Sequence, residues 1–188
     1  MQMQNRVGRF GKWIEMSMRL TVLLGVFAFF ATPASAQDLS SFNTGPVFED
    51  FGPHAPVEGA GELPSLTRFA IAFDVAKKAD AGTRNRGFES AARFINMHVA
   101  AGVPADRIKI AVVVHGGAVR DLVAGDGNAS QAMVRALLDH GVRFIVCGQS
   151  AAAQGIGADE LIDGVEMELS AMTAHALLQQ DGYTVNPF

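Results

Sequence analysis

Cysteine is almost missing from this chain, since Cys147 is the only one among 188 residues. An intrachain disulfide is therefore excluded. Three alternatives remain for the thiol: a buried inert group, a bridge to another chain, or a free reactive group. The five histidines show no HxH or HExxH spacing, and no CxxC pair exists, so we predict no metal site. The sequence also lacks GxGxxG and GxxxxGK[ST], and we expect no cofactor.

Long hydrophobic runs are missing beyond the N-terminus, where residues 20–31 form a 12-residue apolar stretch. Basic residues precede this stretch, and residues 32–36 (TPASA) end in a small-x-small pattern. The combination predicts a signal peptide over residues 1–36, cleaved between Ala36 and Gln37. Because a membrane-spanning helix needs about 20 apolar residues, we expect cleavage rather than anchoring. The mature protein is then periplasmic or secreted, with no membrane attachment.

Positive charge is scarce in the remaining chain. Residues 1–36 contain four of the 15 basic residues and one of the 19 acidic residues, so the formal charge of residues 37–188 is about −7. A negative chain of this kind repels nucleic acids and anionic membranes, and we predict neither as a partner.

The mature sequence divides into two parts. Residues 37–65 contain four prolines and no sustained periodicity, and this predicts an extended arm. Val47, Phe48 and Phe51 are the side chains that would dock the arm on the body or on a neighbouring subunit; a mobile leader is the alternative. Residues 66–188 are predicted to form one domain, which is long enough for a hydrophobic core.

Strand and helix patterns alternate through this domain. Helices are expected at 85–101, 132–140, 151–154 and 171–180, with single turns near 119–123 and 158–162, and strands at 68–75, 107–115, 142–147, 165–169 and 183–185. Ser130 is expected to cap the helix at 132–140. Such alternation predicts an α/β fold. We expect a three-layer α/β/α sandwich around a mainly parallel sheet of about five strands.

Four polar residues end the predicted strands: Asp74, His115, Cys147 and Ser170. The carboxyl ends of parallel strands meet at one edge of a sheet, where ligands bind. Adjacent strands lie about 4.8 Å apart, so the His115 imidazole is predicted to approach the Cys147 sulfur. An imidazolium and a helix starting at Gly148 would both lower the thiol pKa, and the thiolate is the reactive form.

Each of these residues also has a structural interpretation. Cys147 would be a small buried apolar side chain. His115 would fix the Gly116-Gly117 turn by a hydrogen bond. For Asp74 we expect a cap or an ion pair with Lys77 or Lys78 rather than chemistry. His175, in the last predicted helix, has no assigned place.

Several segments together resemble the DsrE/DsrF-like sulfur-relay family, which includes the YchN-like proteins. They are residues 110–116 (IAVVVHG), 137–141, 142–150 (VRFIVCGQS), 159–165 and 178–183. The resemblance extends over residues 68–188. It implies a small α/β sandwich, a homo-oligomer (trimer or hexamer) and a cysteine that carries sulfur as a persulfide. Cys147 is then the sulfur acceptor and His115 its neighbour.

Three hypotheses follow. In the first, an exported sulfurtransferase or sulfur carrier uses Cys147 and His115 as catalytic residues, and exchanges sulfur with donor and acceptor proteins or small sulfur compounds. In the second, the domain is a non-catalytic module for ligand binding or assembly, and Cys147 only packs. In the third, Cys147 is a redox sensor that bridges two subunits.

Overall fold

The computed structural model describes residues 38–186. The predicted signal peptide and its cleavage site lie outside these residues. Among the helices of the described part, none has both the length and the apolar character needed to cross a membrane.

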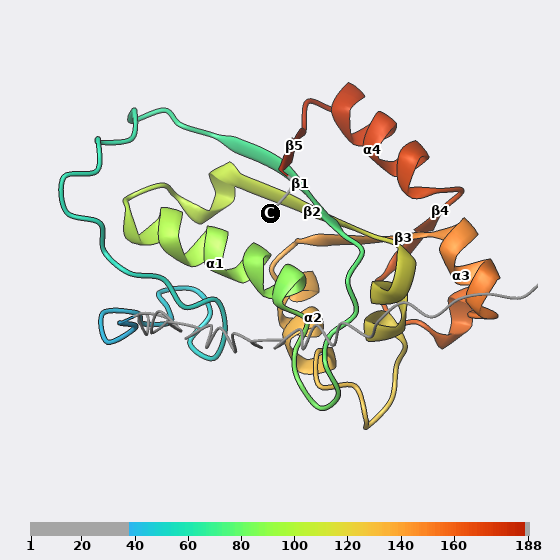
Figure 1. Cartoon of the computed structure of the whole chain (residues 1–188). Coiled ribbons are helices and arrows are strands. Elements are labelled where there is room, and N and C mark those ends of the chain that lie inside the picture. The colour runs from blue at the N-terminus through green and yellow to red at the C-terminus, as the bar shows by residue number, and fades with distance from the viewer. Residues whose placement is uncertain (1–37, 187–188) are drawn as a thin grey trace, which may run out of the picture. The chain divides into compact units, whose positions relative to one another are not determined.

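A five-stranded parallel sheet forms the centre of the domain (Figure 1). The strand order is β4-β3-β2-β1-β5, and every pairing is parallel. The strands are β1 (Phe69–Val75), β2 (Ile108–Val114), β3 (Arg143–Cys147), β4 (Glu166–Glu168) and β5 (Thr184–Asn186). The central strands β1, β2 and β3 are apolar because both of their faces are covered. The predicted α/β class and five-stranded sheet are confirmed.

Helices cover both faces of this sheet. Figure 1 shows α1 and α2 on one side and α4 on the other. The α-helices are α1 (Arg86–Ala100), α2 (Gln131–Asp139), α3 (Gly148–Gln154) and α4 (Ala171–Gln180), and three short 3-10 helices are η1 (Ala105–Arg107), η2 (Gly116–Leu122) and η3 (Ala158–Glu160). The segment predicted to hold one turn near 119–123 is thus a longer 3-10 helix, η2.

The larger part of the core lies between the sheet and helices α1 and α2. Phe88 of α1 and Phe144 of β3 are fully buried there and meet edge to face, with ring centroids 5.3 Å apart. Helix α1 begins directly after Asn85, which caps it: Asn85 Oδ1 accepts hydrogen bonds from the N–H groups of Gly87 and Phe88.

Ser130 does not cap α2, although the sequence predicts that role. Its Oγ instead accepts a hydrogen bond of 2.8 Å from the buried N–H of Asn85. A buried backbone donor without a partner costs more free energy than an uncapped helix start, so the tertiary bond prevails.

The segment before β1 lies against α1 through one buried amide side chain. Asn96 Oδ1 accepts from the N–H groups of Val47 and Phe48, and Asn96 Nδ2 donates to the carbonyls of Phe48, Phe51 and Gly52. Phe48 is part of the core, and Val47 and Phe51 pack against it. In the described residues of this segment, the chain therefore lies on its own domain.

Candidate functional site at the carboxyl edge of the sheet

Three strand-end residues share one face of the sheet. Ala72, Val113 and Ile145 pack with α4 from neighbouring strands. Two positions further along these strands come Asp74, His115 and Cys147, and side chains alternate between the faces with a period of two. Pairing of Val114 with Val146 aligns the ends of β2 and β3. The fold therefore brings these three residues to the α4 side of the carboxyl edge.

Cys147 is the last residue of β3, and α3 begins at the next residue. Its surface is only 6% exposed, so the sulfur lies just beneath the edge rather than on it. Burial acts to raise the pKa of the thiol. The Ser150 hydroxyl and the backbone N–H groups of Ser150, Ala171 and Gln149 act in the opposite direction and outweigh burial, so the pKa of Cys147 is lowered.

The donors around this sulfur come from two helices. Gln149 and Ser150 lie in the first turn of α3, and Ala171 is the first residue of α4. N–H groups at a helix start have no partner within the helix, and they carry partial positive charge. Both helix starts therefore favour the thiolate over the thiol.

Ser150 connects Cys147 to the neighbouring strand end. Its Oγ accepts a hydrogen bond of 3.0 Å from the N–H of Gly116, which leaves the hydroxyl proton for the sulfur. Ser150 is not among the site residues that the sequence predicted. A serine in the third position of a helix that begins directly after a strand-end cysteine is the signal that would have identified it.

Asp74 binds two histidines, and the expected pairing with Lys77 or Lys78 is wrong. Its Oδ2 accepts from His115 Nε2 at 3.1 Å, and its Oδ1 accepts from His175 Nε2 at 2.7 Å. Desolvation acts to raise the pKa of Asp74, but the hydrogen bonds and charges of His175 and His115 outweigh it and lower that pKa. The carboxylate is thus held ionised between two imidazoles.

His175 reaches this cluster from α4, which is 101 residues away from Asp74 in the sequence. Its Nδ1 is buried and has no hydrogen-bond partner in the described part of the chain. His175 belongs to the site although nothing in its local sequence predicted so, because only the packing of α4 on the sheet brings it there.

His115 directly follows β2, the strand next to the Cys147 strand, but bonds to Asp74 on the other side. The groups that lower the Cys147 pKa are N–H and O–H donors near the sulfur, and His115 is not one of them. The predicted effect of the imidazole on thiol ionisation is therefore produced by Ser150 and the two helix starts instead.

The last strand-end residue, Ser170, is the N-cap of α4, and its Oγ accepts from the N–H of Thr173. His98 stacks on Phe94, and His140 meets Phe48 edge to face. Across residues 38–186, no three His, Cys, Asp or Glu side chains are placed to hold a metal ion.

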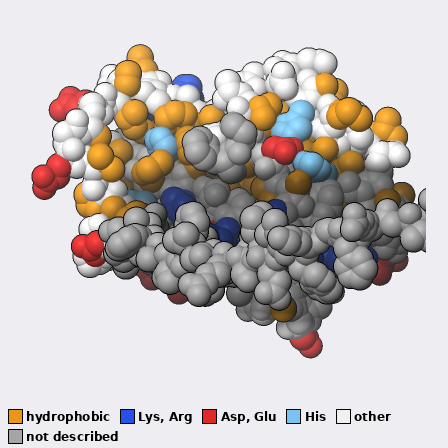
Figure 2. Space-filling view, viewed as in Figure 1, with side chains coloured by type: hydrophobic (Ala, Val, Ile, Leu, Met, Phe, Trp, Pro, Cys, Tyr) orange, Lys and Arg blue, Asp and Glu red, His pale blue; other side chains and the backbone are white. Residues whose placement is uncertain are grey.

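Apolar side chains surround the site on the outside. Leu169 and Met172, which flank the start of α4, are 70% and 80% exposed. In the space-filling view, two histidine side chains lie beside an acidic one, with hydrophobic side chains around them (Figure 2). The start of α4, beside the buried sulfur, therefore exposes large apolar side chains that a helix start in contact with water does not need.

The sequence model of the DsrE/DsrF-like family matches residues 68–187, which include every side chain of this site. The chain belongs to the DsrE/DsrF-like family. Two solved structures are similar to this family member: a protein of unknown function, MTH1491, from Methanobacterium thermoautotrophicum, and the ychN protein from E. coli. They are 23% and 22% identical, and each gives a TM-score of 0.47 over 64% of this chain and 99% of its own. No curated protein matches the sequence.

Proposed function

We propose that this DsrE/DsrF-like protein is exported and carries sulfane sulfur on Cys147. The observation that carries the proposal is the position of Cys147, the only thiol, at the end of β3 and directly before α3, where Ser150 and two helix starts lower its pKa. A thiolate is the form that attacks sulfur, and sulfur transfer between thiols needs no resident cofactor.

Loading would proceed by attack on a sulfane sulfur donor such as thiosulfate. The Cys147 thiolate forms a new S–S bond to the outer sulfur of thiosulfate, and the S–S bond within thiosulfate breaks. Sulfite leaves with the bonding electron pair, and one proton is taken up, which gives Cys–S–SH. In the second half, an acceptor thiolate attacks the outer sulfur, becomes the persulfide and releases the Cys147 thiolate.

Asp74 and the two histidines would bind and release the proton that is taken up in this cycle. His115 is the more exposed of the two imidazoles, and its bond to Asp74 fixes the orientation of the ring. We assign proton exchange with solvent to His115, and we assign Asp74 and His175 to positioning it.

The burial of Cys147 restricts the donor. A persulfide extends about 2 Å beyond the cysteine sulfur, and this brings the outer sulfur closer to the surface than the thiol itself. Small donors such as thiosulfate or polysulfide therefore suit the loading step, and a protein acceptor would meet the outer sulfur. The exposed Leu169 and Met172 flank this position and support a homo-oligomer or a partner protein there.

Mass spectrometry of the protein after incubation with thiosulfate or polysulfide tests the proposal. We expect an adduct of about 32 Da on the peptide that contains Cys147, removed by dithiothreitol. The Cys147→Ser variant should gain none. Absence of the adduct in the folded wild-type protein, or equal uptake by Cys147→Ser, would falsify sulfur carriage.

The low exposure of Cys147 also favours a second candidate, a non-catalytic binding or assembly module in which the cysteine packs. Titration with a thiol reagent discriminates between the two. Reaction of the native protein supports the carrier, whereas reaction only after denaturation supports the module. A disulfide-linked dimer on non-reducing electrophoresis would instead indicate the redox sensor.

A further inference from the structure

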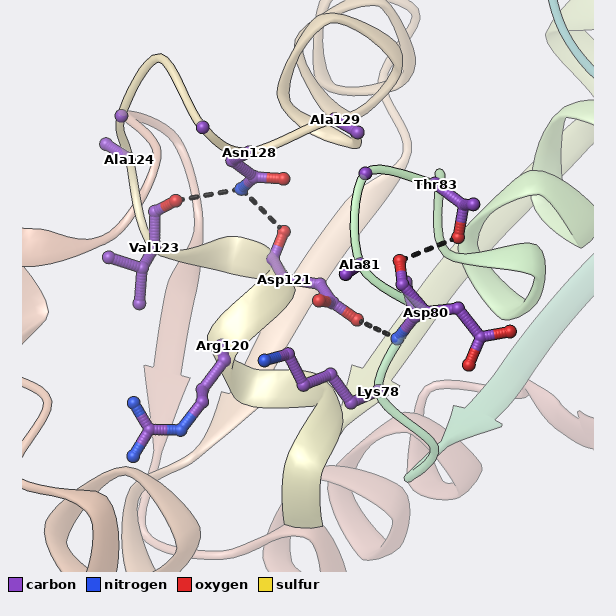
Figure 3. A pocket seen from close by; sticks show the side chains of 14 residues that line it. Lys78, Asp80, Ala81, Thr83, Arg120, Asp121, Val123, Ala124, Asn128 and Ala129 are labelled. Carbon is purple, nitrogen blue, oxygen red and sulfur yellow. Dashed lines mark hydrogen bonds between the residues drawn. The ribbon is translucent and has the colours of Figure 1, made fainter.

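A second hollow lies away from Cys147, between the loop that follows β1 and the segment that follows η2 (Figure 3). Its volume is ≈ 430 Å³, and its lining consists of residues 78–83, 120, 121, 123–125 and 127–129. None of the Cys147 site residues takes part. The position after the carboxyl ends of β1 and β2 is where open α/β sheets bind ligands, and the volume suits a small molecule.

Two cationic side chains line this pocket, and neither forms an ion pair with a carboxylate among the described residues. They are Lys78 and Arg120. Figure 3 shows the Lys78 side chain extending toward the backbone of Arg120, whose guanidinium extends away from Lys78. In a domain whose net charge is negative, two cations in one pocket lining that form no ion pair among the described residues mark a local positive site.

The two carboxylates of the lining are directed elsewhere. Asp121 is buried, and its Oδ2 accepts hydrogen bonds of 2.7 Å from the Ala79 N–H and from Asn85 Nδ2. Figure 3 shows the Asp80 carboxylate pointing away from Lys78 and Arg120. Asp121 therefore holds the β1–α1 loop in place, and Asp80 leaves the cationic side of the pocket open.

The loop also offers backbone donors. Within the described chain, the N–H groups of Asp80, Ala81 and Gly82 donate to no protein acceptor. The rest of the wall is mainly alanine and glycine, which leaves room for a ligand and gives it few apolar contacts. Free N–H groups beside unpaired cations recognise oxyanions.

We propose that this pocket binds a small organic oxyanion, a carboxylate or phosphate ester, with its anionic group at Lys78 and Arg120. The inference does not depend on sulfur carriage, because the two sites share no residue. The small-residue wall admits the body of the ligand, and the loop N–H groups add hydrogen bonds to its oxygens.

Isothermal titration calorimetry of the full chain tests this with two probes, inorganic phosphate and succinate, and with neutral glycerol as a control ligand. We expect saturable binding of at least one anion and none of glycerol. Lys78→Gln and Arg120→Gln should each weaken binding about tenfold, since each removes a charge-assisted contact. Arg120→Lys should retain part of the affinity.

Lys109→Gln is the matched control, because Lys109 is an exposed lysine on β2 outside this pocket. It removes the same charge and should leave the affinity unchanged. Circular dichroism checks that every variant is folded. The proposal is overturned if neither anion saturates the folded protein, or if Lys109→Gln weakens binding as much as Lys78→Gln. Binding that persists in Cys147→Ser supports a site independent of the thiol.

Discussion

The two faces of the sheet differ in what they bury and in what they expose. Toward α1 and α2, 22 buried residues form one continuous cluster that includes Phe88 and Phe144. Toward α4, the buried cluster has six residues, and four of them are alanines or valines. The second face carries Asp74, His115, Cys147 and His175, and exposed apolar side chains lie beside them.

This difference separates stability from chemistry. The face toward α1 and α2, the thick face, supplies most of the buried apolar side chains. Their burial is the main source of folding free energy. The face toward α4, the thin face, is covered by this one helix. The first N–H group of α4 helps to lower the Cys147 pKa, and its His175 bonds to Asp74. Substitutions on the two faces should therefore differ in kind: loss of stability on one, and altered ionisation or reactivity on the other.

The largest expected effect comes from Phe88→Ala on the thick face. Removing a fully buried phenyl ring should lower the free energy of unfolding by about 3–5 kcal/mol, measured by urea denaturation. Met172→Ala on α4 is the control, and it should change that free energy by about 0.5 kcal/mol or less because Met172 is exposed. Equal losses from the two would contradict the division.

Next in size is Asn96→Ala, which removes the five hydrogen bonds that hold residues 47–52 on α1. We expect a loss of about 2 kcal/mol, because buried backbone groups lose their partners. Amide hydrogen exchange at Val47 and Phe48 should accelerate. Met97→Ala, on the exposed side of the same helix, should leave this exchange unchanged; acceleration there too would show that the helix as a whole holds the segment.

Ser150→Ala should act on ionisation rather than on stability. The hydroxyl lowers the Cys147 pKa, so its removal shifts the alkylation rate profile with iodoacetamide to higher pH. Ser65→Ala, at an exposed position before β1, should leave the profile where it is. An unchanged profile in Ser150→Ala would mean that the N–H groups of the two helix starts alone lower the Cys147 pKa.

The smallest effect is expected from Asp74→Asn. Because the folded-state pKa of Asp74 is lowered, its ionised form stabilises the fold at pH above the ordinary aspartate value of about 3.9, and this stabilisation disappears as pH falls through the folded value. The carboxylate is more than one third exposed, so we expect less than about 1 kcal/mol. Urea denaturation at pH 7 and pH 3 should show the gap to wild type closing at the lower pH.

Much of the fold follows from local patterns. The apolar runs at 69–75, 108–114 and 143–147 specify buried parallel strands, and Asn85 marks the start of α1. The position of Cys147 between a strand and a helix follows in the same way. Strand ends can be placed from the sequence because hydrophobic periodicity and glycine act over a few residues.

The partners of the site residues could not be predicted so well. Asp74 was expected to pair with nearby lysines, whereas it binds His115, which follows β2, and His175 from α4. Ser130 was expected to cap its own helix but binds the N–H of Asn85. In each case a contact between distant segments replaces a local one, because burial makes the distant bond worth more than a solvated local pair.

The sequence by itself determined the α/β alternation, the resemblance to the DsrE/DsrF-like family and the strand-end place of Cys147. The tertiary structure decided which groups surround that sulfur, namely Ser150, the start of α3 and the start of α4. It also decided that one carboxylate joins two histidines from different elements. The reason is physical: hydrogen-bond partners depend on side-chain direction and helix packing, which local periodicity does not encode.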